Sequence, residues 1–291
     1  MSYSTQKANS YTLCITCPAA TGLVAAVTTH LASKGCYISE LQQYDDEETQ
    51  RFFMRCVFIA PAEAVSAEAI LGADWAATAT LHSMEWRVRR GDEKQRVLLM
   101  VSKFDHCLRD LLYRWESGEM PMDVVGIVSN HEALKPIADR YHLPFILIPV
   151  TAQTKPEAED KLRRVIAECR ADLVVLARYM QILSDELSRD LAGHCINIHH
   201  SFLPSFKGGS PYAQAHTRGV KLIGATAHYV TGDLDEGPII DQDVRRIDHR
   251  YSVAEMQALG RDIEAVVLAR AVRMHLEDRV FIDGNKTIVF A

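Results

Sequence analysis

The segment RVLLMVS at residues 96–102 is apolar almost throughout, and it limits the possible folds more than any other feature of this sequence. A strand with one face in water alternates apolar and polar side chains, whereas the strands of parallel sheets are buried on both faces and do not. Further short apolar runs follow, separated by stretches whose apolar residues recur at helical spacing. We therefore expect residues 96–291 to form an open, doubly wound, mostly parallel α/β sheet.

The elements expected in this part of the chain alternate regularly. The expected strands are 96–102, 122–130, 144–150, 171–179, 194–200, 221–230 and 238–246. The expected helices are 107–118, 131–141, 155–170, 185–191 and 252–275.

Residues 9–90 show a different order of elements, β-α-β-β-α-β, which predicts a ferredoxin-like plait. We expect Trp75, in the second helix, to anchor its packing. The short polar stretch 91–95 is expected to link the two domains. The expected strands here are 11–17, 36–45, 50–60 and 83–90, and the expected helices are 23–35 and 62–80.

Composition and termini narrow the class of protein. A length of 291 residues fits two domains, since about 150 residues per domain is usual. The net charge of −6 argues against nucleic-acid binding, because phosphates would be repelled. No run approaches the roughly 20 apolar residues of a membrane span, and MSYSTQKANSYT does not resemble a secretory signal. Seven scattered cysteines fit a reducing compartment. We expect a soluble, cytoplasmic protein without nucleic-acid or membrane partners.

Polar residues follow four of the expected strands: Ser102 and Lys103, residues 129–131, residues 178–181 and residues 197–201. The carboxyl ends of parallel strands lie on one side of a sheet, so we expect these groups to converge on a pocket. The loop TGDLDEGP at 231–238 is expected to contribute acidic groups to the same pocket.

Asn197 and His199 lie two residues apart on an expected strand, so their side chains should share one face. Two such donors suit the stabilisation of one developing oxyanion. A nearby carboxylate such as Asp235 could hold the imidazole protonated or orient a water. Ile198 and His200 should point to the opposite face, so the adjacent histidines should not bind one metal ion. An ordinary polar turn ending at Pro204 is the alternative that the local sequence leaves open.

Two longer segments, NIHHSFLP (197–204) and HYVTGDLDEGPII (228–240), together resemble the active-site signature of the folate-dependent formyltransferase family. The resemblance implies that Asn197 and His199 stabilise the oxyanion of a tetrahedral intermediate and that Asp235 assists proton transfer, with no metal or redox cofactor. It also implies that the backbone of 176–183 holds the pterin ring. The expected substrate-binding residues are Arg178, Met180, Gln181, Leu183, His228, Gly232, Leu234, Lys103 and His106.

The formyl acceptor differs between branches of this family. The glycinamide ribonucleotide branch has a G-x-G-S-N loop that cradles a phosphate, whereas this sequence has no glycine between Val101 and Arg114. The methionyl-tRNA branch carries a C-terminal barrel, which we do not expect here. Nearly the whole chain is similar to the formyltetrahydrofolate deformylases of one-carbon metabolism, in which residues 9–90 correspond to a regulatory ACT domain and 96–291 to the catalytic domain.

That resemblance implies hydrolysis of 10-formyltetrahydrofolate to formate and tetrahydrofolate. Two alternatives remain: formyl transfer to an amine, or a catalytically silent protein that senses folate or an amino acid. ACT domains bind amino-acid effectors near a D-x-x-G turn, but the stretch here, CPAATG, lacks the acid. The loop SFKGGSPYAQA (205–215), which includes Lys207, could alter access of water to the pocket. Edge pairing of the plait predicts a homo-oligomer.

Overall fold

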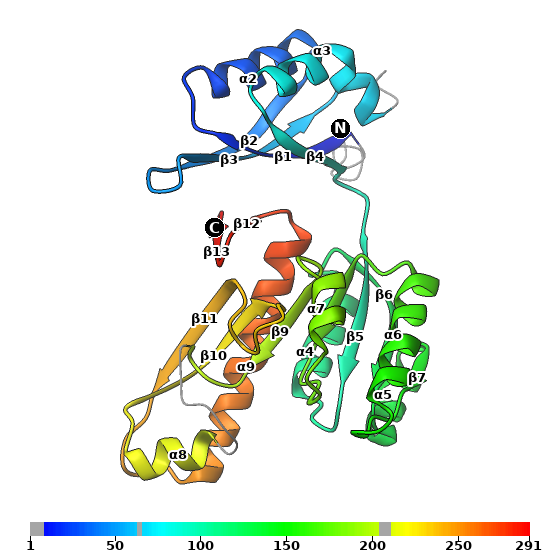
Figure 1. Ribbon diagram of the computed structural model, residues 1–291, viewed down its shortest axis with the longest axis vertical. Coiled ribbons are helices and arrows are strands. Elements are labelled where there is room, and N and C mark those ends of the chain that lie inside the picture. The colour runs from blue at the N-terminus through cyan, green and yellow to red at the C-terminus, as the bar shows by residue number, and fades with distance from the viewer. Residues whose placement is uncertain (1–8, 63–65, 204–210) are drawn as a thin grey trace. The chain divides into compact units, whose positions relative to one another are not determined.

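The computed structural model describes residues 9–62, 66–203 and 211–291 (Figure 1). These residues form two compact units. The first runs to Lys94 and also includes Asp278–Phe281 and Ile288–Ala291, and the second comprises Gln95–Glu277 and Ile282–Thr287. The sequence predicts a single change of domain at 91–95, whereas in the structure two short C-terminal segments join the first unit. Within the described residues, no helix combines the length and apolar character needed to cross a bilayer.

The first unit is a four-stranded antiparallel sheet in the order β2-β3-β1-β4, with both helices on one face (Figure 1). This order is that of the expected ferredoxin-like plait. Trp75 is fully buried between the sheet and the helices, as predicted. No side chain caps the start of α2, where Gly22 adopts a positive φ of 91°. The elements are β1 (Ser10–Pro18), α2 (Leu23–Ser33), β2 (Tyr37–Asp46), β3 (Arg51–Ile59), α3 (Ala67–Leu81) and β4 (Glu85–Arg90).

The second unit is built on a seven-stranded sheet in the order β11-β10-β9-β8-β5-β6-β7. Strand β10 runs antiparallel to both of its neighbours, and the other strands are parallel, which confirms the mostly parallel sheet. The strands are β5 (Gln95–Val101), β6 (Met122–Ser129), β7 (Phe145–Leu147), β8 (Leu173–Leu176), β9 (Cys195–His199), β10 (Leu222–Tyr229) and β11 (Ile239–Arg246).

The helices of this unit cover the sheet. Helix α9 packs on β9, β10 and β11 and against α4, while α6 packs with Leu98 of β5 in a second apolar cluster. The helices are α4 (His106–Glu116), η1 (Glu132–Leu134), α5 (Lys135–Arg140), α6 (Lys155–Cys169), α7 (Asp185–Asp190), α8 (Pro211–Arg218) and α9 (Val253–Leu276). The predicted helix 131–141 is divided because Pro136 lies at the start of α5. Helix α8 and the hairpin of β12 (Val280–Asp283) and β13 (Lys286–Val289) are not predicted from the sequence.

The order of strands reverses between β5 and β8. From β5 the chain moves outward to β6 and β7, then returns so that β8 pairs with the other side of β5. Ligands of open α/β sheets bind at such a switch point, beyond the carboxyl ends of the strands. The fold therefore directs attention to the residues that follow β5, β8 and β9.

Candidate active site

A cavity of about 840 Å³ lies in the second unit. Residues that follow β8 and β9, the loop between β10 and β11, and one face of α9 form its wall. The predicted site residues in this wall are Asn197, His199, Asp235, Arg178, Met180, Gln181, Leu183, His228, Gly232, Leu234 and His106. Lys103 is exposed and lies outside the wall.

The ends of the central strands lie close together, but of the four predicted groups only 178–181 and 197–201 contribute to the cavity wall, and residues 102–103 and 129–131 do not. The hydroxyl of Ser102, after β5, donates to Asn130 Oδ1, after β6, over 2.7 Å. The backbone N–H of Met180, after β8, donates to the same Ser102 hydroxyl over 2.8 Å. The segment that follows β8 is therefore tied to the end of β5.

Asn197, His199 and Asp235 meet at one side of the cavity. His199 Nδ1 lies 3.2 Å from Asp235 Oδ1. Asn197 Nδ2 lies 3.3 Å from His228 Nε2, which is itself 3.8 Å from Asp235 Oδ1. Asn197 and His199 share one face of β9, as the strand alternation predicts, and the loop after β10 brings the carboxylate to them.

His228 is buried and fixes the amide of Asn197. Its Nδ1 lies 2.9 Å from the carbonyl oxygen of Tyr229, so this nitrogen carries the proton and donates it. Nε2 is then free to accept one N–H of Asn197. Burial lowers the pKa of His228, which agrees with a neutral ring. The second amide N–H of Asn197 remains available for a ligand.

Asp235 has a constrained backbone and a stabilised charge. Its φ is +57°, in the left-handed region that few residues other than glycine adopt. Burial raises the pKa of the carboxyl group, but the hydrogen bond and charge of His199 outweigh burial, so the pKa lies below its ordinary value. The carboxylate form is thus the one present at neutral pH.

The prediction that His200 points away from His199 is wrong. The two rings stack, with centroids 5.1 Å apart and planes 22° from parallel, and both line the cavity. Strand β9 ends at His199, so His200 no longer follows the strand alternation on which the prediction rested. The expectation that His199 and His200 cannot bind one metal ion rested on diverging side chains, so it loses its basis.

Arg178 determines the state of His200. Its Nη1 donates to His200 Nδ1 over 2.6 Å, which requires that nitrogen to be unprotonated. Burial, followed by the charges of Arg178 and His199, lowers the pKa of His200 to about 4. Arg178 has a φ of +66°, and its guanidinium lies over the ring of Phe104. A neutral His200 is therefore held between an arginine and His199.

Glu264 of α9 lies behind this arginine and is a site residue that the sequence does not predict. It is 2% exposed, and its carboxylate lies 2.8 Å from His106 Nε2 and 3.2 Å from Arg178 Nε. Tyr212 donates its hydroxyl to the other oxygen over 3.1 Å. Tyr212 can approach because residue 260 is glycine: a Cβ there would lie 1.9 Å from the hydroxyl oxygen.

A ring nitrogen of His106, Cys107 Sγ and a Glu264 oxygen lie within 4.8 Å of one another, a spacing that a metal ion can use. Burial raises the pKa of Glu264, but His106 and Arg178 outweigh it, so the carboxylate is charged and already paired. Burial also raises the pKa of Cys107, which opposes the thiolate that a metal needs. The adjacent guanidinium repels a cation, so these residues fit an internal ion cluster better than a metal centre.

Pro204, Lys207 and the rest of 204–210 lie outside the described residues. The predicted effect of the 205–215 loop on access to the cavity stays a prediction.

The lowered pKa of His200 predicts a loss of stability in acid. Between about pH 6.5 and 4 the unfolded chain binds a proton at this ring that the folded chain does not bind, so the free energy of unfolding falls as pH falls. The slope is at most about 1.4 kcal/mol per pH unit. A His200→Gln variant cannot titrate at this position. We expect the difference in thermal unfolding temperature between parent and variant to shrink from pH 7 to 4.5. A constant difference would contradict a neutral, half-buried His200.

Residues 95–272 match the formyl transferase family model. The chain is 48% identical over 279 residues to a formyltetrahydrofolate deformylase from Corynebacterium, with 96% of this chain and 97% of the relative covered. It is 43% identical to a formyltetrahydrofolate deformylase from Bacillus subtilis, with 99% of each covered.

Solved structures give a consistent result. The crystal structure of a formyltetrahydrofolate deformylase from Burkholderia mallei matches with a TM-score of 0.92 and 50% identity, over 97% of this chain and all of that one. A phosphoribosylglycinamide formyltransferase from Anaplasma phagocytophilum matches with a TM-score of 0.62 and 27% identity, over 68% of this chain and 96% of its own.

Proposed function

Since this chain belongs to the formyltetrahydrofolate deformylase family and hydrolyses 10-formyltetrahydrofolate to formate and tetrahydrofolate, we propose that Asn197, His199 and Asp235 carry out the reaction. The observation that supports this assignment is the 3.2 Å contact between His199 and Asp235 beside Asn197, within one cavity. Segment 176–183 and loop 231–237 would bind the folate on either side of them.

In the proposed first step a water molecule attacks the formyl carbon. Asp235, directly or through His199, orients this water and takes one of its protons. The carbonyl oxygen becomes an oxyanion, which accepts hydrogen bonds from the free amide N–H of Asn197 and from protonated His199. In its protonated form His199 gives Nδ1–H to Asp235 and keeps Nε2–H for the oxyanion. Stabilising a developing charge with donors already in place is commonly the largest contribution to catalysis.

In the second step the bond between the formyl carbon and N10 breaks. The oxyanion collapses to the carboxyl group of formate, and N10 leaves with the proton that the water supplied. His228 does not touch the reacting atoms in this scheme. It positions Asn197 by accepting one of the two amide hydrogens, so that the other stays directed to the substrate.

The identity of the residues around His106 supports water as the acceptor. His106, Tyr212 and Arg178 each direct one donor to Glu264, so those donors are not directed to a phosphate. The buried carboxylate of Glu264 would also repel a phosphorylated acceptor.

The proposal also covers the role of the first unit, the oligomeric state, the cellular compartment and the cofactor requirement. The first unit is proposed to act as an ACT domain with an amino-acid effector and to contribute to a homo-oligomer. Its plait topology and the relatives of nearly full length support this proposal. The reaction is proposed to proceed in the cytoplasm without a metal or other cofactor, because Asn197, His199 and Asp235 can supply each donor and acceptor that hydrolysis needs.

The direct test measures formate release by the purified protein from 10-formyltetrahydrofolate at pH 7, with no amine added. We expect stoichiometric formate and tetrahydrofolate. The matched reaction with glycinamide or another small amine should show no increase in rate and no formylated amine. The absence of formate without an amine, together with a formylated amine when one is added, would overturn the proposed use of water.

A further inference from the structure

The segment between β8 and α7 forms part of the cavity wall without any regular secondary structure. Residues 177–184 belong to neither a helix nor a strand, so no ladder of backbone hydrogen bonds fixes their path. One attachment has been described: Met180 donates to Ser102. The far end of the segment needs a separate restraint if the wall is to keep its shape.

Glu159 of α6 supplies such a restraint. It is 9% exposed, and one of its oxygens accepts the backbone N–H of Ser184 over 2.8 Å. The other oxygen accepts the hydroxyl hydrogen of the same serine. That hydroxyl in turn accepts the N–H of Leu187 and caps α7. One buried carboxylate therefore fixes both the end of the segment and the start of the next helix.

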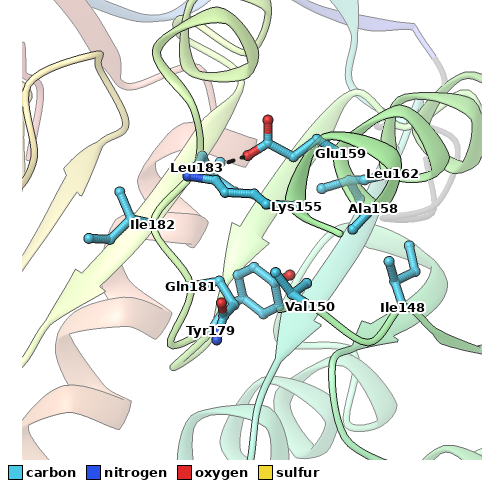
Figure 2. Close-up of a pocket in the computed structure, with 10 residues that line it drawn as sticks. All are labelled: Ile148, Val150, Lys155, Ala158, Glu159, Leu162, Tyr179, Gln181, Ile182 and Leu183. Carbon is cyan, nitrogen blue, oxygen red and sulfur yellow. Dashed lines mark ion pairs between the residues drawn. The ribbon is translucent and has the colours of Figure 1, made fainter. Parts of the chain in front are cut away.

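The segment is backed by a second, much smaller cavity (Figure 2). Tyr179, Gln181, Ile182 and Leu183 line both this small cavity and the 840 Å³ cavity, so they form the wall between the two. In Figure 2, Glu159 and Lys155 reach toward Leu183, at the opposite end of the pocket from Tyr179 and Gln181. The small cavity has a volume of only about 10 Å³, which is the space of one water molecule at most. The wall thus has almost no room to move back.

We propose that Glu159 is a positioning residue for the folate: by holding Ser184 it sets the shape of wall 179–183 and thereby the affinity for substrate. This inference rests on the proposed folate-binding role of that segment. Glu159 does not line the large cavity, so it acts through Ser184 and not by contact with the substrate. Its loss should weaken binding of substrate and transition state alike, which raises KM and leaves kcat nearly unchanged.

The test compares Glu159→Ala and Glu159→Gln with the parent. Hydrogen bonds to a charged group are stronger than those between neutral groups, so we expect Glu159→Ala to raise the KM for 10-formyltetrahydrofolate by about tenfold or more. We expect its kcat to stay within about threefold. Glu159→Gln should recover part of the KM, since its amide oxygen can still accept the N–H of Ser184. A KM unchanged in the alanine variant, or a kcat that falls as far as kcat/KM, would overturn the proposal.

Matched variants separate positioning from general stability. Lys155→Ala removes a partly exposed charge from the same helix. The ion pair between Lys155 and Glu159 spans 4.0 Å, and its loss should leave KM unchanged. The double variant Glu159→Ala, Ser184→Ala should raise KM by less than the product of the two single effects, because both changes break the same hydrogen bond between hydroxyl and carboxylate. Additive effects would mean that Glu159 acts elsewhere.

Binding of tetrahydrofolate, measured at equilibrium, distinguishes this inference from the proposed function. Weaker binding to Glu159→Ala supports the positioning role even if the parent releases no formate. Equal binding by parent and variant, in a parent that does release formate, overturns the positioning role and leaves the proposed function intact.

Discussion

An Asp235→Asn variant is expected to lose about a thousandfold in kcat for formate release. Positioned acids and bases contribute roughly 10²–10⁴ in rate, and the amide can neither take a proton from water nor offset the charge of protonated His199. Asparagine has nearly the shape of aspartate and tolerates the left-handed conformation found here, so the loop should keep its path. The measurements are steady-state formate release and equilibrium binding of tetrahydrofolate. The binding constant for tetrahydrofolate should change by no more than a few fold.

Asp233 provides the matched control for this prediction. It lies two residues earlier on the same loop, is exposed, and undergoes the same loss of charge in Asp233→Asn. Because Asp233 lies on the loop proposed to bind the folate, the KM of the control can change, but its kcat should remain close to that of the parent. Asp235→Asn activity within about tenfold of the parent would remove Asp235 from the mechanism.

The Asn197→Ala variant is expected to lose about 10²–10³ in kcat, the usual effect of removing one oxyanion donor. The carbonyl of bound substrate carries little charge before the reaction, so KM should change much less than kcat. His199→Ala should show an effect of at least this size, because it removes both a donor and the partner of Asp235. The measurement is formate release under saturating substrate.

A His228→Gln variant tests the proposed division of roles between His228 and Asn197. It removes only the ring that holds the Asn197 amide, so its loss in kcat should be smaller than that of Asn197→Ala. An Asn197→Ala enzyme with a raised KM and a kcat within threefold of the parent would show that Asn197 binds the ground state and not the oxyanion.

The parts of the fold that follow from local pattern could be predicted from the sequence. Apolar runs such as 96–102 identify strands buried on both faces, and helical spacing identifies α6 and α9, because both patterns depend on the chain only over short distances. The hairpin of β12 and β13 carries a sequence signal that was missed, the turn dipeptide Gly284-Asn285 between the two strands. The inclusion of 278–281 and 288–291 in the first unit has no comparable signal, since it depends on contacts with residues more than 200 positions away, such as Cys14 and Phe53.

The residues of the candidate site likewise fall into two groups, those that the sequence predicts and those that only tertiary packing determines. Asn197 and His199 could be placed together by strand alternation, and the resemblance to formyltransferases directed attention to Asp235. His200 could not be placed, because its orientation depends on where β9 ends and on Arg178. Glu264 lies on a largely apolar helix and Glu159 on a largely charged one. Neither was predicted, because the sequence of such a helix does not show whether a single acidic residue on it is buried or exposed. Only tertiary packing brings Arg178 to the first and Ser184 to the second.

The left-handed backbone of Arg178 and Asp235 has a consequence for engineering this fold. Such a conformation costs a residue other than glycine on the order of 1 kcal/mol, so these are positions where glycine would be selected if folding stability were the only criterion. Arg178 holds His200, and Asp235 holds His199, through side chains that glycine lacks. A search for heat-resistant variants and a search for fast ones would therefore favour different residues at these two places, and a design that accepts every stabilising glycine would produce a robust but inert protein.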